Sequence, residues 1–244
     1  MRLKGKVALV TGAGSGFGAG IARRFAEEGA RVVVNDINGE AGKRIATEIS
    51  GDFVQGDVTR SEDWRRLVAA APRLDILVNN AGWTHRRKPY VEVTEAEFDK
   101  VYAVNVKSVY LSAVHAVPVF RRQGGGCIVN IASTAGVRPR PGLTVYNSSK
   151  GAVITMSKSM AAELGPDKIR VNCVNPVFSP DTALSAEFAG GSLSEEAKKA
   201  FLATIPLGRF STPLDVANAC LYLASDDASM VSGVCIEVDG ARCV

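Results

Sequence analysis

Tyr146 and Lys150 are residue types that could carry out acid–base chemistry together. In the segment YNSSK the ammonium follows the phenol by four positions, and residues at that spacing project from one face of a helix. A phenol titrates at about pH 10, and a nearby cation favours its ionised form, so the pair could act as a base nearer neutrality. A tyrosine–lysine pair on a helix is more often a surface feature, so the interpretation depends on the surrounding elements.

Ser133 could bring a third polar group to the same place. It closes the apolar run 126–133, and the helix that carries Tyr146 is expected at 144–164. The carboxyl ends of the strands in a doubly wound parallel sheet open onto the ligand crevice. The sequence therefore predicts that Ser133 and Tyr146 lie at the edge of one ligand site.

The order of the elements predicts such a sheet. Strands are expected at 6–12, 30–36, 52–55, 74–82, 126–133, 169–176 and 233–240. Helices are expected through Phe25, at 39–49, from Ser61 as N-cap, at 95–122 and at 144–164. Because the strands are nearly all apolar, they should be buried on both faces between two layers of helices. We predict one α/β domain over residues 1–244, a doubly wound Rossmann fold with a mostly parallel seven-stranded sheet.

The glycine-rich stretch TGAGSGFG, residues 11–18, joins the first strand to the first helix. Glycines there let the backbone turn sharply and approach a pyrophosphate at the helix N-terminus, where free N–H groups favour anions. A tight turn without a ligand is the alternative, but the position between strand and helix favours dinucleotide binding. The residues expected to contact the cofactor here are Gly12, Ser15, Gly16, Phe17 and Gly18.

The second expected strand ends at Asp36, about 20 residues after the glycine turn, where an acid can bind the ribose hydroxyls of the adenosine half. A carboxylate there repels a 2′-phosphate, and the next residue is Ile37 instead of a cation. We therefore expect NAD(H) to be preferred over NADP(H). Asp57 and Val58 end the third strand and are expected near the adenine, while Asn80 is expected to line the cofactor.

Together these motifs resemble the classical short-chain dehydrogenase/reductase family over residues 3–240. The residues that carry the resemblance are TGAGSGFG (11–18), DV (57–58), NNAG (79–82), Asn105, Ser133, YNSSK (146–150) and NP (175–176). The resemblance implies that Tyr146 is the general acid/base and that Lys150 lowers its pKa and holds the nicotinamide ribose. It also implies that Ser133 binds the substrate oxygen and that Asn105 holds a water in a proton relay. A homotetramer is implied in the same way.

The stretch after the sixth strand departs from the family pattern. Val177 stands where the family commonly has glycine, and Thr182 comes later than the usual threonine. Contacts to the nicotinamide carboxamide are expected around Val177–Ser179. The irregular segment 177–205 has a length typical of a functional lid, and we expect it to cover the substrate.

Composition excludes several classes of function. A net charge of +4 does not call for nucleic acid or an anionic membrane as partner. No apolar run of about 20 residues is seen, and the first strand begins almost at Met1, so a cytoplasmic protein is expected. Five scattered cysteines without a CxxC pair, and two histidines, predict neither a disulfide framework nor a metal site.

Two basic loops, HRRK (85–88) and RPRP (138–141), follow the fourth and fifth strands. Our hypothesis is that Arg86, Arg87 and Arg138 favour an anionic substrate; a solvated rim is the simpler alternative. Trp83, Phe178 and Phe188 could form apolar pocket walls. The reading that fits best is hydride transfer between NAD(H) and a secondary alcohol or ketone. The alternatives are a 3-oxoacyl-thioester reductase and a non-catalytic NAD-binding sensor or scaffold.

Overall fold

Seven parallel strands form the central sheet in the order β3-β2-β1-β4-β5-β6-β7. The structure, a computed structural model, describes residues 1–71, 73–180, 182–189 and 194–244. The strands are β1 (Val7–Thr11), β2 (Arg31–Asp36), β3 (Asp52–Gln55), β4 (Ile76–Asn79), β5 (Gly126–Ile131), β6 (Ile169–Pro176) and β7 (Cys235–Val238). The strand order reverses between β1 and β4, and ligand sites in doubly wound sheets lie outside the strand ends at this point.

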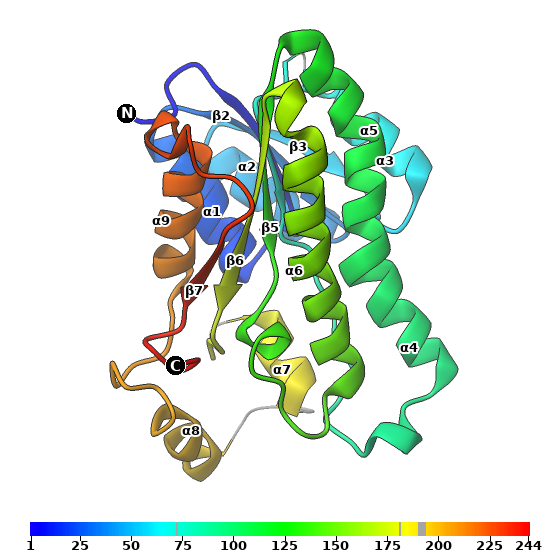
Figure 1. Cartoon of the computed structure of the whole chain (residues 1–244), viewed down its shortest axis with the longest axis vertical. Coiled ribbons are helices and arrows are strands. Elements are labelled where there is room, and N and C mark those ends of the chain that lie inside the picture. The colour runs from blue at the N-terminus through cyan, green and yellow to red at the C-terminus, as the bar shows by residue number, and fades with distance from the viewer. Residues whose placement is uncertain (72, 181, 190–193) are drawn as a thin grey trace.

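Helices cover both faces of the sheet (Figure 1). One face carries α1 (Gly16–Glu27), α2 (Gly39–Glu48) and α9 (Pro213–Ala224). The other carries α3 (Ser61–Ala69), α4 (Glu95–Tyr102), α5 (Ser108–Gln123) and α6 (Thr144–Leu164). The doubly wound Rossmann fold predicted from the sequence is confirmed.

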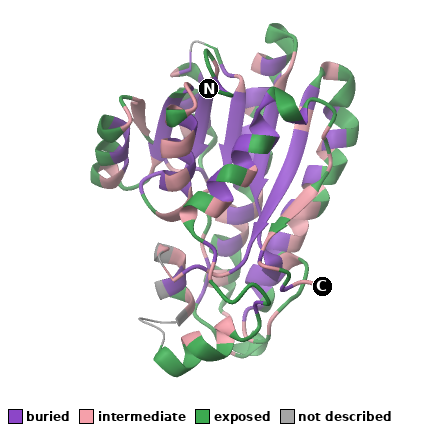
Figure 2. Cartoon of the chain, turned by 90° about the vertical axis from the view of Figure 1, so that its left-hand side faces the viewer, coloured by how far each residue is buried: buried purple, intermediate pink, exposed green. Residues whose placement is uncertain are grey.

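Alternate residues of each strand build two separate cores, because successive side chains of a strand point to opposite faces. Val10 packs on the α1 and α9 side together with Phe25. Its neighbour Leu9 packs on the other side with Trp64 and Phe120. The inner strands β1, β2, β4, β5 and β6 are accordingly buried along most of their length (Figure 2), which explains why they are largely apolar, whereas the edge strands β3 and β7 are only partly buried.

The elements differ from the predicted ones mainly at their ends. Ser61 is not the N-cap of α3: Arg60 occupies that position, without a side-chain bond, and Ser61 is the first helical residue. The helix predicted at 95–122 is divided by a π-helical segment, Ala103–Lys107, between α4 and α5. Strands β4, β5 and β7 are shorter than predicted. The polar and glycine residues at the ends of the predicted ranges lie outside the hydrogen-bonded strands.

Among the described residues, one helical stretch passes a test of length and apolar composition for crossing a membrane, although the sequence has no uninterrupted apolar run of that length. It is Glu95–Gln123, which contains an 18-residue window with a mean hydropathy of 1.2. The core helix of a water-exposed protein meets the same criteria, and this stretch packs Leu111, Val117 and Phe120 into the core on one face of the sheet. Burial therefore accounts for its composition.

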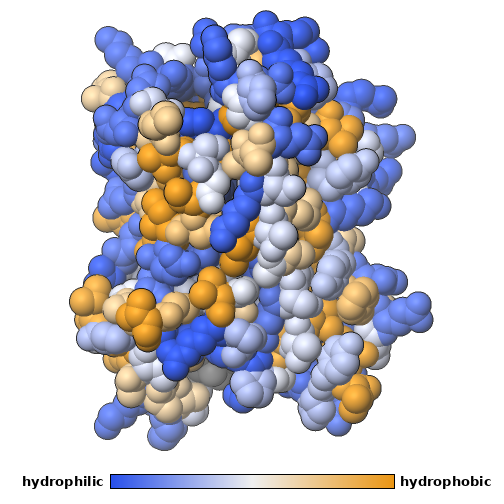
Figure 3. All heavy atoms as spheres, in the orientation of Figure 1, coloured by the Kyte–Doolittle hydropathy of each residue, from blue (hydrophilic) through white to orange (hydrophobic). Residues whose placement is uncertain are grey.

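The outer face shown in Figure 3 has mainly hydrophilic atoms around its rim, with separate hydrophobic patches between them.

Two short helices, α7 (Ala183–Ala189) and α8 (Glu195–Leu202), follow β6. They lie at the end of the molecule that also holds the C-terminus, below the carboxyl ends of β6 and β7 (Figure 1). Both helices belong to the segment 177–205 that the sequence singled out as a lid; positions 181 and 190–193 of it lie outside the described residues. The placement of α7 and α8 at the carboxyl edge is what brings this segment to the ligand crevice.

Candidate active site

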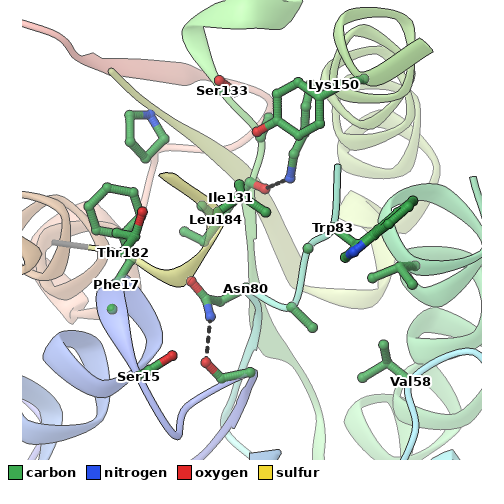
Figure 4. A pocket seen from close by; sticks show the side chains of 18 of the residues that line it. Ser15, Phe17, Val58, Asn80, Trp83, Ile131, Ser133, Lys150, Thr182 and Leu184 are labelled. Carbon is green, nitrogen blue, oxygen red and sulfur yellow. Dashed lines mark hydrogen bonds between the residues drawn. The ribbon is translucent and has the colours of Figure 1, made fainter. Parts of the chain in front are cut away.

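A cavity of about 470 Å³ opens at the carboxyl edge of the sheet. It runs from Ser15 and Val58 at one end to Ser133 and Lys150 at the other (Figure 4). The residues predicted from the sequence that line it are Gly12, Ser15, Gly16, Phe17, Asp36, Ile37, Asp57, Val58, Asn80, Ser133, Tyr146, Lys150, Val177 and Ser179. Two predicted residues, Gly18 and Asn105, are not among its lining residues. Side chains from distant parts of the chain therefore meet in one crevice.

The glycine turn, residues 11–18, needs its glycines because neighbouring backbone segments approach it closely. Gly12 and Gly16 have φ of +61° and +53°, in the left-handed region that favours glycine. A Cβ on Gly12 would lie 2.9 Å from the Cα of Ala81, so the β1 turn and the β4 turn touch through bare backbone. A Cβ on Gly18 would overlap the carbonyl oxygen of Gly12. Gly18 therefore serves the packing of α1 against the turn, and the cavity wall is left to Gly12 and Gly16.

Asp36 is held at the end of β2 by backbone donors. Its carboxylate accepts hydrogen bonds from the N–H groups of Gly14 and Asn38, both at 2.8 Å. An ionised carboxylate can accept about four hydrogen bonds, so acceptor capacity remains for a ligand. The neighbouring Ile37 is 67% exposed at the rim. The loop thus presents a fixed negative charge and an apolar side chain at the far end of the cavity.

The turns after β3 and β4 are braced by their own polar side chains. The carboxylate of Asp57 accepts from the N–H and the hydroxyl of Thr59. Asn80 donates to the carbonyl oxygens of Thr11 and Gly12, at 2.8 and 3.0 Å, which ties the β4 turn to the glycine turn. Asn79 points away from the cavity, into a buried network with Ser112 and Asn130. Of the two asparagines, Asn80 is the one at the cavity, as the sequence predicted.

Tyr146 lies buried between Ser133 and Lys150. Its side chain is 3% exposed, and the ammonium of Lys150 lies 5.8 Å from the centre of the phenol ring. That ammonium donates to the carbonyl oxygen of Ile131 at 2.9 Å (Figure 4). Ser133 follows β5 and begins a short 3₁₀ turn, where its hydroxyl accepts from the N–H of Ala135 at 3.1 Å. The three side chains predicted to act together are therefore adjacent.

The electrostatics of this trio differ from the expectation. Burial raises the pKa of Tyr146 to about 12, and the groups that oppose the rise are the hydroxyl of Ser133 and the cation of Arg140. Burial lowers the pKa of Lys150 to about 8. Lys150 is not among the groups that lower the pKa of Tyr146 in this structure. The cation that opposes the rise, Arg140, comes from the loop after β5, and the spacing of the YNSSK pair did not reveal it.

Asn105 lies in the π-helical segment, behind the cavity. Its amide oxygen accepts from the N–H of Trp83 at 2.8 Å, and its amide nitrogen donates to the carbonyl of Trp83 and to Ser149. π-Helical turns are often found at functional sites. Here the turn aims the asparagine at the loop after β4 and joins that loop to α6, the helix of Tyr146 and Lys150. The structure places Asn105 as a brace between these elements.

Some polar groups of the segment after β6 already form hydrogen bonds within the protein. The N–H of Val177 donates to Val238, and its carbonyl accepts from Ser211. Ser179 lines the cavity, is 2% exposed, and its hydroxyl has no partner among the described residues. Thr182 also lines the cavity, against Gly16. Ser179 is therefore the member of the predicted 177–179 stretch whose side chain is free to bind a ligand.

The basic loops contribute differently from the prediction. Arg86, Arg87 and Arg138 do not line the cavity, and Lys88 forms an ion pair with Glu97 at 2.7 Å. Arg140 does line it. His85 of the same loop is buried outside the cavity lining. Ordinary packing was the favoured interpretation of Trp83, Phe178 and Phe188, but all three line the cavity as apolar walls.

The cysteines lie outside this cavity lining. Cys127 and Cys173 are buried in the core, as predicted, whereas Cys235 at the sheet edge is only half-buried. Within the described ranges, no group of three histidine, cysteine or carboxylate side chains is arranged to hold a metal ion.

The residues present fit a nicotinamide dinucleotide. The backbone cradle at Gly12 and Gly16 would be filled by any Cβ, and it opens at the N-terminus of α1, where an anion is favoured. The unpartnered hydroxyl of Ser179 lies in the same cavity and could bond a carboxamide. A doubly wound sheet with this cradle at its switch point, and a polar trio beside it, is typical of nicotinamide-dependent oxidoreductases.

The comparisons with known proteins agree with this class. Residues 12–241 match the family described as Enoyl-(Acyl carrier protein) reductase. The chain is 51% identical over 251 residues to 4-formylbenzenesulfonate dehydrogenase TsaC1/TsaC2 of Comamonas testosteroni, with 99% of each chain covered. It is 40% identical to 3-oxoacyl-[acyl-carrier-protein] reductase FabG of Thermotoga maritima, with 98% of each covered.

Among solved structures, the chain is similar to 3-ketoacyl-(acyl-carrier-protein) reductase from Brucella melitensis complexed with NADH. The TM-score is 0.93 and the sequence identity 42%, with 99% of this chain and 100% of the other covered. The chain belongs to the short-chain dehydrogenase/reductase family, as the motifs predicted. It is an oxidoreductase of that family and takes a nicotinamide cofactor.

Proposed function

We propose that the protein transfers a hydride between NAD(H) and a small alcohol or carbonyl compound, with Tyr146 as general acid/base. The observation that carries the proposal is the burial of Tyr146 in the cavity beside Ser133 and Lys150, at the end opposite Asp36. A secondary alcohol or ketone was the substrate expected from the sequence. An aldehyde enters the proposal because a relative of 51% identity is named for 4-formylbenzenesulfonate.

Each residue of the trio has a distinct task in this mechanism. The cofactor, when bound, supplies or accepts the hydride at the substrate carbon. Ser133 holds the substrate oxygen by a hydrogen bond, and Tyr146 donates a proton to that oxygen in reduction or removes it in oxidation. The high pKa of the buried Tyr146 keeps the phenol protonated near neutrality, which suits proton donation in the reducing direction. Lys150 and Arg140 place positive charge near the phenolate formed by that donation.

The cofactor is held by groups at both ends of the cavity. The glycine turn would bind the pyrophosphate, Asp36 the adenosine ribose, Lys150 the nicotinamide ribose and Ser179 the carboxamide. We propose NAD(H) over NADP(H), because the carboxylate of Asp36 would repel a 2′-phosphate. Comparing kcat/KM for NADH and NADPH at one saturating substrate concentration tests this preference. A higher value for NADPH would contradict it.

A Tyr146→Phe variant tests the proposed acid/base. It removes the hydroxyl and keeps the ring against Phe188, whose ring centre lies 5.0 Å away in an edge-on arrangement. We expect turnover to fall by roughly a hundredfold or more, since general acid–base catalysis contributes factors of about 10² to 10⁴. Unchanged binding of NADH, measured by its fluorescence, is the control for folding. Full turnover by this variant would reject the mechanism.

A 3-oxoacyl-thioester reductase is the second candidate, because relatives of about 40% identity carry that name. Assays with acetoacetyl-CoA and with small aldehydes and ketones, each with NADH, distinguish the two. A non-catalytic NAD-binding role is opposed by the complete trio. It would be supported only if every substrate failed while NADH still bound.

We also propose that α7 and the segment 177–205 act as a lid over the substrate. Leu184 and Phe188 of α7 pack against Tyr146 and line the cavity. A homotetramer is proposed for assembly, because apolar side chains on α4 and α5, Phe98, Tyr110 and Val114, are exposed. Light scattering at several protein concentrations tests this assembly.

The five free cysteines fit a reducing compartment such as the cytoplasm.

A further inference from the structure

Two arginines come together beside the Tyr146 end of the cavity. Arg140 lines the cavity, and its guanidinium carbon lies 5.7 Å from the ring centre of Phe188 and 5.1 Å from that of Phe201. The guanidinium carbon of Arg242, which follows β7, lies 5.0 Å from the same Phe201 ring. The loop after β5 and the end of the chain thus bring two cations to one aromatic side chain.

Neither arginine forms an ion pair with a carboxylate in the described part of the chain. Arg242 is 7% exposed; its Nε donates to Thr204 at 3.0 Å, while its Nη1 is buried without a described partner. The Nε of Arg140 is also buried without a described partner. The side-chain carboxylate nearest to Arg242 in sequence, Asp239, accepts two backbone N–H groups of its own turn instead. Both guanidinium groups therefore retain unused donors.

This arrangement is electrostatically unfavourable as it stands. Burial lowers the pKa of Arg140, and the cations of Arg242 and Arg87 lower it further, while Tyr146 opposes the shift. Arg138 donates to the main-chain carbonyl of Arg242 and so fixes its backbone while adding another positive charge. Buried cations ordinarily have an anionic partner, because leaving the charge unpaired is costly. An anion that enters from the cavity would remove this cost.

We propose that Arg140, which lines the cavity, forms a subsite for a carboxylate or sulfonate group carried by a small aromatic substrate. Arg242 does not line the cavity; it adds a second positive charge from the other contact with the Phe201 ring. This inference rests on the proposed function, because it names the substrate class of the same site. The planar guanidinium fork matches the oxygens of both anions. Phe178 and Phe188 line the cavity and provide apolar surfaces for an aromatic ring.

The position of Arg140 also defines how such a substrate would lie. The guanidinium carbon of Arg140 and the ring centre of Tyr146 lie 5.7 and 5.0 Å from the ring centre of Phe188, so the two side chains are near neighbours in the cavity. A substrate with its carbonyl at Tyr146 and its anionic group at Arg140 would therefore be short, with one ring between the two groups. Arg140 replaces Arg86, Arg87 and Arg138 in the earlier hypothesis, since Arg140 lines the cavity and those three side chains do not.

The test compares matched aldehydes in the full-length enzyme with NADH. Benzaldehyde, 4-carboxybenzaldehyde and 4-formylbenzenesulfonate differ in charge at one ring position, and the readout is the ratio of kcat/KM for each anionic aldehyde to that for benzaldehyde. In Arg140→Gln and in Arg242→Gln we expect this ratio to fall about tenfold to a hundredfold, the range for losing a charge-assisted hydrogen bond. The fall should lie mainly in KM. Arg140→Lys should keep part of the ratio because it keeps the charge.

Arg86→Gln is the matched control. It removes the same charge from the exposed loop after β4, outside the cavity, so the ratio should stay within about twofold of the wild type by the usual weakness of screened surface charges. Circular dichroism and NADH binding establish that each variant is folded. Equal ratios in wild type, Arg140→Gln and Arg242→Gln would overturn the proposal. The proposal would also be overturned if the arginine variants raised only the KM for acetoacetyl-CoA. The cations would then bind the phosphates of coenzyme A.

A binding measurement separates this inference from the proposed function. Benzenesulfonate has no carbonyl group, so its binding to the enzyme in the presence of NAD does not depend on turnover. Calorimetric binding that is lost in Arg140→Gln and kept in Arg86→Gln supports the subsite even if none of the aldehydes reacts. Aldehyde turnover without any benzenesulfonate binding, and without a preference for the anionic aldehydes, would reject the subsite and leave the proposed function standing.

Discussion

The ammonium of Lys150 donates a hydrogen bond of 2.9 Å to the carbonyl oxygen of Ile131, the last residue of β5. This bond joins α6 to the carboxyl edge of the sheet and holds a cation in a site where Lys150 is 3% exposed. The carbonyl oxygen is a neutral acceptor, so the desolvation of the ammonium is only partly compensated. Burial accordingly lowers the pKa of Lys150 to about 8.

This burial predicts how stability depends on pH. The ordinary pKa of a lysine side chain is about 10.4. Between pH 8 and this value, the unfolded state therefore binds more protons at Lys150 than the native state does. The free energy of unfolding should rise with pH across this window. The cost of the buried cation is fully present below about pH 8 and disappears as pH rises through this window. Lys150→Met should lack this rise, which amounts to at most about 3 kcal/mol for a shift of this size.

Urea denaturation of wild type and Lys150→Met at a series of pH values from 7 to 10 checks this. The relevant quantity is the difference between the two proteins, because other groups titrate in both. Lys158→Met serves as a control, since it removes a lysine from an exposed position of the same helix. A wild-type-minus-variant difference that is flat across this range would show that Lys150 is not destabilised by burial.

Gly18 should not tolerate a side chain. A Cβ there would overlap the carbonyl oxygen of Gly12 and lie 2.9 Å from the Cα of Ala13. We expect Gly18→Ala to cost about 1–3 kcal/mol of stability, as overpacking typically does, and to weaken NADH binding because the glycine turn must move. Gly165→Ala is the control, since nothing lies within 4 Å of its Cβ. Urea denaturation and NADH titration report both effects, and equal behaviour of the two variants would contradict this explanation.

Asp36 should determine the choice between the two cofactors. Asp36→Ala removes the acceptor for the ribose hydroxyls and the charge that would repel a 2′-phosphate, so kcat/KM for NADPH relative to NADH should rise about tenfold or more. Glu40→Ala makes a similar change in charge at an exposed position on α2 and should leave the ratio unchanged. The measurement is steady-state kinetics with both cofactors. If the two variants had the same ratio as the wild type, Asp36 would not be the discriminating residue.

Glu97 should stabilise the start of α4. Its carboxylate forms a capping box with Thr94 and an ion pair with Lys88, at 2.7 Å. The bonds to Lys88 and Thr94 lower the pKa of Glu97 to about 2, so this stabilisation is present above pH 4.5 and is lost as pH falls toward 2. Glu97→Gln should cost about 1 kcal/mol at pH 7. The cost should shrink in acid.

Thermal unfolding of Glu97→Gln beside Glu95→Gln is the measurement. Glu95 lies in the same first turn, is exposed, and has no bond from its side chain to another described residue. A loss of stability confined to Glu97→Gln, and smaller at pH 3 than at pH 7, is the expected result. Equal losses in both variants would assign the effect to the helix dipole alone.

Much of this site could be predicted because its signals are local. A glycine turn between a strand and a helix, Asp36 at a strand end and YNSSK on one helix face are short patterns with direct physical causes. The parallel order of the strands then brings these patterns to one edge of the sheet. Fourteen of the predicted residues line one cavity for this reason.

The residues that sequence reasoning missed depend on contacts between distant segments. Arg242 lies in the last turn of the chain, and no local pattern marks it; only its position after the carboxyl end of β7 could have indicated that edge. Arg140 was overlooked within a loop where Arg138 was chosen, because loop geometry decides which side chain enters the cavity. The raised pKa of Tyr146 has the same origin, since its burial depends on Leu184 and Phe188 of α7.

The sequence by itself determined the class of fold, the glycine turn and the polar trio proposed to react, because apolar periodicity and short turns are encoded within a few neighbouring residues. Only the tertiary structure decided the charges around the trio and which arginine lines the cavity. Desolvation and electrostatic interactions depend on which groups meet in space, and those groups come from the loop after β5, from α7 and from the end of the chain.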